Sequence, residues 1–111
     1  MGGGPVTALK TRPHAADITR AATALTVAAD LLSREKWHPL RNPLMRAIDR
    51  AVGYTPGKGG VKAEAVTLAA WDLLCLHLEC EWAGDWERKA GRTQAEVLDA
   101  LHGAAAKAAA S

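Results

Sequence analysis

The sequence predicts a single all-α domain, a compact arrangement of four helices. Three observations lead to this prediction. Apolar residues recur at helical spacing in four segments, Ala and Leu dominate the apolar residues while Phe is absent, and stretches rich in Gly or Pro separate the segments. We expect residues 1–13 to be a flexible leader and residues 14–111 to be the helical domain, which is large enough to bury about 65% of the unfolded surface.

The longest apolar segment without Gly or Pro covers about residues 61–82, and we expect it to be the central helix. Its apolar side chains form two seams, which leave only a narrow polar strip near Asp72 and Glu79. A helix that is apolar around most of its circumference is covered by neighbouring helices. On this interpretation Trp71 and Trp82, which lie on one seam, belong to the core.

Local signals define the other three helices. An apolar stripe predicts a helix over residues 15–36. A shorter helix over residues 43–52 is predicted because Asn42 suits an N-cap and Gly53 suits the residue that ends a helix. The stretch Thr93-Gln-Ala-Glu96 forms a capping box at the start of the last helix.

Three stretches are similar to a known family. They are Ala28-Ala-Asp-Leu-Leu32 with Trp37, Ala47-Ile-Asp-Arg-Ala-Val-Gly53, and Trp86 followed by Gly91-Arg-Thr-Gln-Ala-Glu-Val-Leu98. Together they resemble a domain-of-unknown-function family of small helical proteins from actinobacteria and their phages. The specific part is the string that begins at Gly91. The resemblance implies a small helical fold and brings no assigned activity. This chain departs from the family pattern after Trp86, where it has Glu-Arg-Lys-Ala and relatives have Asn-Asp-x-Pro.

Patterns for catalysis and for bound cofactors are incomplete. Gly57 and Lys58 belong to a loop that lacks the Ser or Thr of a phosphate-binding P-loop. His77 and Glu81 are four residues apart, but no further ligands complete a zinc site. Neither a nucleophile elbow nor a zincin motif is present, and no apolar run approaches a membrane span. We therefore expect a cytoplasmic, non-enzymatic protein with no metal, cofactor or small-molecule substrate.

The two cysteines, Cys75 and Cys80, are five residues apart on the predicted central helix. On a regular helix this spacing separates them by about 7.5 Å along the axis and places them on different faces. The Cα atoms of a disulfide stay within roughly 7 Å of each other. We therefore predict two buried free thiols in a reducing cytoplasm.

Charge is segregated along the chain. Residues 34–62, the basic stretch, hold seven basic and two acidic residues, whereas residues 63–87, the acidic stretch, hold six acidic residues and no basic one. One interpretation is that the two stretches face each other in the bundle or cover adjacent faces. The other is a surface for nucleic-acid phosphates. Its candidate residues are Arg41, Arg46, Arg50, Lys58 and Lys62.

Two tryptophans lie near predicted helix ends. Trp37 follows the first helix and Trp86 lies in the connector before the last one, so they either cap the bundle or anchor a partner. Glu79 and Asp85 would add charge complementarity beside them. The first functional hypothesis is therefore a non-catalytic interaction or regulatory protein that binds a protein partner or itself. The alternative is a nucleic-acid-associated protein that uses the basic stretch.

Overall fold

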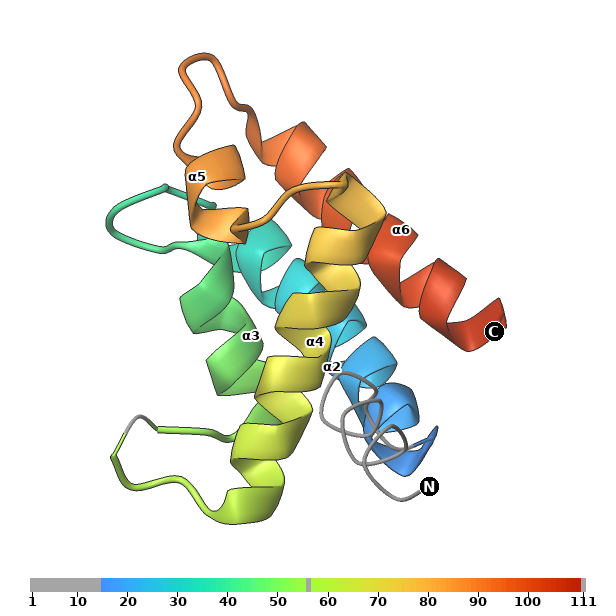
Figure 1. The fold of residues 1–111 in the computed structure, drawn as a ribbon. Helices are drawn as coiled ribbons and strands as arrows, with labels where there is room; N and C mark the ends of the chain where they lie inside the picture. Colours follow the sequence, from blue (N-terminus) through green and yellow to red (C-terminus); the bar gives the residue numbers. More distant parts are fainter. Residues whose placement is uncertain (1–14, 56, 111) are drawn as a thin grey trace.

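A computed structural model describes residues 15–55 and 57–110 and shows an all-helical domain (Figure 1). The helices are α2 (Ala15–Glu35), α3 (Leu44–Val52), α4 (Val61–Leu78), α5 (Ala83–Glu87) and α6 (Gln94–Ala110). The predicted all-α fold with four main helices is confirmed, and the connector contains α5 as an additional short helix. The predicted leader lies outside the described residues.

The core lies between α2 and the inner face of α4. Helix α2 packs against α3, α4 and α6. In Figure 1, α2 passes behind α4, with α3 on one side and α6 on the other. Large aliphatic residues that are completely buried fill the centre: Leu25, Leu32, Leu44, Ile48, Leu74 and Leu101. Helices α2 and α6 pack against each other, and both contribute buried alanines to the core, including Ala21, Ala28, Ala100 and Ala104. Small side chains allow the two backbones to approach closely.

Helix α4 contacts each of the other described helices, as expected of a central helix. It is shorter than predicted, because the chain leaves the helix after Leu78 and Glu79 adopts a left-handed conformation with φ 54° and ψ 43°. The expectation that neighbours cover nearly all of its surface is wrong. Val61, Leu68 and Leu76 on its outer face are 85%, 49% and 74% exposed.

The predicted helix ends are partly confirmed. Gly53 ends α3 with φ 84°, and its N–H donates to carbonyls of the last turn. The capping box is present, because the Thr93 N–H donates to Glu96 Oε1 (2.9 Å) and the Glu96 N–H donates to Thr93 Oγ1 (3.2 Å). Asn42 does not cap α3. Its side-chain amide donates to the Lys36 carbonyl instead (3.1 Å).

Candidate partner-binding surface

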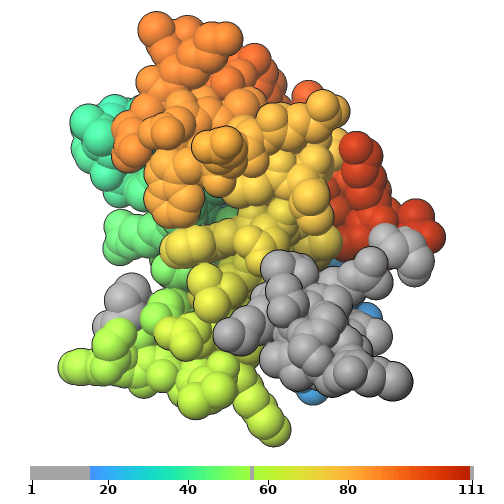
Figure 2. Space-filling model, viewed as in Figure 1, coloured from blue at the N-terminus to red at the C-terminus, as the bar shows by residue number. Residues whose placement is uncertain are grey.

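A groove opens where the end of α4, the short helix α5 and the start of α6 meet. The α4 and α5 segments adjoin at the surface in Figure 2. The volume of the groove is about 620 Å³. We call it the tryptophan groove and define it by its lining residues: Cys80, Glu81, Trp82, Asp85, Trp86, Lys89 and Arg92. It contains Trp86 and Asp85, which the sequence analysis selected, and Glu79 immediately precedes it.

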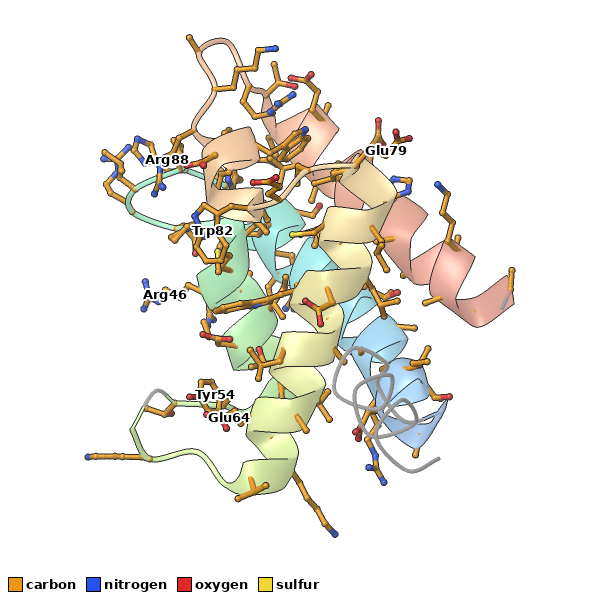
Figure 3. The ribbon with its side chains drawn as sticks, viewed as in Figure 1. Arg46, Tyr54, Glu64, Glu79, Trp82 and Arg88 are labelled. Atoms are coloured by element: carbon orange, nitrogen blue, oxygen red, sulfur yellow. The ribbon has the colours of Figure 1, made fainter. Side chains whose placement is uncertain are left out.

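Trp82 is the exposed aromatic residue of this groove. Its side chain is 43% exposed and meets Trp71 edge to face, with ring centroids 6.0 Å apart and an interplanar angle of 78°. The prediction that Trp82 belongs to the core is therefore wrong. The reason is the end of α4, since the turn at Glu79 takes Trp82 off the helical seam (Figure 3). Its indole lies over Gly84, where a Cβ would be 2.6 Å from Trp82 Nε1.

Trp86 is half-buried and is covered on one ring face by a cation. The guanidinium carbon of Arg92 lies 3.8 Å from the ring centroid, a cation–π geometry. Arg92 also donates from Nε to the Trp86 carbonyl (2.9 Å) and forms an ion pair with Glu96 (3.1 Å). These contacts hold Trp86 in place, and Trp86 also lines the groove.

Trp37 is held inside the domain by hydrogen bonds. Its indole Nε1–H donates to Glu87 Oε2 (2.7 Å), and its backbone N–H donates to Gln94 Oε1 (2.9 Å). The indole is half-buried against the core. The polar group of the Trp37 indole is therefore already occupied within the chain.

The buried carboxylate of Glu87 joins three segments and was not selected by the sequence analysis. Glu87 is only 2% exposed, and the same Oε2 atom that accepts from Trp37 accepts from the Leu44 N–H (2.7 Å). Glu87 thus provides the cap that α3 does not obtain from Asn42. Burial raises the pKa of the Glu87 carboxyl above its ordinary value, although both hydrogen bonds oppose this shift.

The acidic residues around the groove carry charge with little internal compensation. Glu79 and Glu81 are exposed, and neither forms an ion pair among the described residues. Asp85 lies 3.7 Å from Arg88, but both side chains are well exposed, so this contact is weak. The groove therefore combines two indoles with the exposed carboxylates of Glu81 and Asp85, and the bases Lys89 and Arg92 also line it.

The basic stretch follows α3 and the loops at its two ends (Figure 1). Arg50 is engaged there by Glu35 through two hydrogen bonds of 2.6 and 2.9 Å. This contact lowers the pKa of the Glu35 carboxyl and raises the pKa of Arg50. The other four candidate residues form no ion pair among the described residues: Arg41, Arg46, Lys58 and Lys62. Arg46 projects away from α3 in Figure 3.

Ion pairs do not join the basic stretch to the acidic stretch among the described residues. The two stretches instead meet through hydrogen bonds, from Thr67 Oγ1 to Asp49 Oδ1 (2.6 Å) and from Tyr54 Oη to Glu64 Oε2 (3.5 Å). Asp49 is half-buried, and this burial raises the pKa of its carboxyl. In the described part of the chain, the charged residues of the two stretches thus do not neutralise each other by ion pairs across the stretches, although Glu87 is buried and Asp49 is partly so.

The described residues contain no group of three or more His, Cys, Asp or Glu side chains that converge as metal ligands. His77 packs against Gly103 of α6, and Glu81 lies beyond the end of α4. No helix within the described ranges has the length and apolarity needed to cross a bilayer. Comparisons with protein-family models, curated proteins and solved structures found no match.

Proposed function

We propose that this chain is a non-catalytic interaction protein of the cytoplasm that binds a protein partner through the tryptophan groove. The observation that supports the proposal is the combination of Trp82, which is 43% exposed, with the unpaired acids Glu79 and Glu81. An indole supplies much of the energy of a protein interface when a partner covers it. Carboxylates at the rim favour a partner segment in which Lys or Arg flanks an apolar side chain.

The conformation of Glu79 adds a second argument. A residue with a Cβ in the left-handed region costs roughly 1 kcal/mol compared with Gly, the residue that most often ends a helix in this way. The backbone N–H of Glu79 closes the last turn of α4, but its carboxylate is exposed and forms no ion pair among the described residues. A carboxylate at a strained and exposed position supports a functional role for Glu79.

The test selects peptides and then measures their affinities. A library of random peptides is selected against the protein, and we expect enrichment of segments that combine a basic with an apolar residue. Trp82→Ala should lower the affinity for the selected peptides by roughly 30-fold, as for an interface hot spot. The double variant Glu79→Gln/Glu81→Gln should lower this affinity as well. Val61→Ala is the matched control, because Val61 is 85% exposed at the opposite end of α4.

Two outcomes would contradict this proposal. One is a selection that enriches no basic and apolar combination. The other is an equal loss of affinity for the Trp82 and Val61 variants, which would place the contact outside the groove. Binding to a second copy of this chain is measured separately by sedimentation of the wild type and the Trp82 variant over a range of concentrations, since homo-oligomers use the same kinds of surface.

A nucleic-acid-associated role is the second candidate, and the unpaired cations Arg41, Arg46, Lys58 and Lys62 favour it. Fluorescence anisotropy with labelled duplex and single-stranded DNA, at about 50 and about 200 mM salt, tests this role. An affinity that falls steeply with salt would support phosphate contacts. So would a slope of log affinity against log salt concentration that is smaller by about one for Arg46→Ala. Absence of binding at both salt concentrations would exclude them.

The resemblance to small helical proteins of actinobacteria and their phages supports an accessory role for either activity. The matching string from Gly91 to Leu98 contains Arg92, which covers Trp86, and the capping box of α6. In this proposal the string fixes one wall of the groove, and the segment from Glu79 to Trp82 forms the edge that meets the partner.

A further inference from the structure

The turn that ends α4 brings the two cysteines together. The Glu79 N–H donates to the Leu76 carbonyl (3.3 Å), and the Cys80 N–H donates to the Cys75 carbonyl (3.1 Å). With Glu79 in the left-handed region, this pair of hydrogen bonds is the Schellman motif. The side chains of the two residues joined by its longer hydrogen bond commonly contact each other. In this chain those residues are Cys75 and Cys80.

The electrostatics of Cys75 agree with this geometry. Burial raises the pKa of the Cys75 thiol, and a neighbouring Cys80 charge and hydrogen bond raise it further, while the Ala83 N–H lowers it. Thiols affect each other in this way only when the two sulfurs are close. Both cysteines are free, as predicted, although they are half-buried rather than buried. The reasoning that the five-residue spacing keeps them apart is wrong, because it assumed a regular helix through Cys80.

The two thiols are both half-buried, but their surroundings differ. Cys80 lines the tryptophan groove, whereas Cys75 packs against the core from the last turns of α4. A small molecule in the groove therefore reaches Cys80 first. Cys75 lies behind it, in the position of a resolving thiol.

We propose that Cys75 and Cys80 are a reversible redox pair that closes to an intramolecular disulfide when a small disulfide, such as oxidised glutathione, enters the groove. The Cys80 thiolate attacks one sulfur of that disulfide, whose S–S bond breaks and releases one glutathione thiolate. The Cys75 thiol then loses its proton to solvent and attacks Cys80 Sγ, which expels the second glutathione thiolate. Two protein thiols are oxidised, and one oxidised glutathione is reduced to two thiols.

The pair lies at the base of the segment that carries Trp82. A disulfide between the two cysteines would tie Cys80 to the last turns of α4. Cys80 lies between Glu79 and the exposed Trp82 in the chain, so the disulfide would anchor this segment. The state of the thiols would thus set how freely this edge of the groove moves. This inference stands on the geometry of the turn and does not require that the groove bind a partner.

The test is an equilibrium with mixtures of reduced and oxidised glutathione, followed by intact mass, in native buffer and in denaturing urea. If the fold holds the thiols together, the equilibrium constant for the intramolecular disulfide is larger in native buffer, by at least roughly tenfold. An equal or smaller constant in native buffer would overturn the proposal. So would disulfide-linked dimers or a lasting glutathione adduct as the main product of the wild type.

Single-cysteine variants test the assigned order of attack. Cys75→Ser retains the accessible thiol and should accumulate a glutathione adduct that cannot resolve. Cys80→Ser retains the half-buried thiol and should form its adduct at least several-fold more slowly. A faster reaction of Cys80→Ser would refute the assignment of Cys80 as the attacking thiol.

Discussion

Replacement of Glu87 tests whether one buried carboxylate joins α3, α5 and Trp37. Glu87→Ala leaves the Trp37 indole N–H and the Leu44 N–H without their acceptor, which lies 2.7 Å from each. Each unsatisfied buried donor costs about 1–3 kcal/mol, so we expect a loss of roughly 2–6 kcal/mol in the free energy of unfolding. A domain of this size has only about 5–15 kcal/mol in total. Urea unfolding followed by circular dichroism measures the change.

Glu87→Gln separates the hydrogen bonds from the charge, because a Gln carbonyl still accepts from both donors. Burial raises the pKa of the Glu87 carboxyl in the folded state, so the folded state binds the proton more tightly than the unfolded state does. The stabilisation from protonated Glu87 is complete below the unfolded pKa and is lost as the pH rises through the folded pKa. Relative to the wild type, Glu87→Gln should therefore become more stable as the pH rises through this window.

Glu81→Gln serves as the control, since Glu81 is exposed and its replacement should change stability by less than about 0.5 kcal/mol. The reasoning would be refuted if Glu87→Ala cost less than about 1 kcal/mol, because two buried donors could not then depend on this carboxylate. A stability difference between Glu87→Gln and the wild type that does not vary with pH would refute the raised pKa.

Three further substitutions test local features by urea unfolding. Thr93→Ala should cost about 1 kcal/mol, because it removes the acceptor of the Glu96 N–H, and an unchanged midpoint would show that the capping box does not stabilise α6. Gly53→Ala should cost about 1–2 kcal/mol, because φ is 84° there although a Cβ would meet no neighbour; a neutral result would argue against the left-handed conformation. Gly103→Ala should stabilise α6 by about 1 kcal/mol only in a His77→Ala background, because a Cβ collides with the His77 ring; equal gains in both backgrounds would disprove this contact.

The features predicted correctly from the sequence depend on residues within one helical turn. Thr93 and Glu96 form their capping box from residues three apart, and Gly53 ends α3 because Gly favours positive φ. The apolar stripe of α2 likewise determined its bounds to within one residue, since it ends at Glu35. These signals are local in sequence and local in structure.

The errors come from residues whose partners are distant in the sequence or whose conformation their type does not favour. The end of α4 was missed because Glu79 is not a residue type that predicts a left-handed turn, and the misplacement of Trp82 and Cys80 followed from it. Glu87 was missed because its partners, Leu44 and Trp37, are 43 and 50 residues away. An acidic residue next to a tryptophan in a short connector was the only local sign.

The buried alanines of α2 and α6 limit how the sequence can vary. Because Ala28 and Ala104 carry a single methyl group each, replacement by Gly removes little apolar area, whereas a larger side chain must displace the elements packed around it. Substitution there is asymmetric, since enlargement is the costly direction. Among sequences that keep this fold, we expect these positions to exchange among Ala, Gly and Ser while the leucines of the core exchange among larger aliphatic residues.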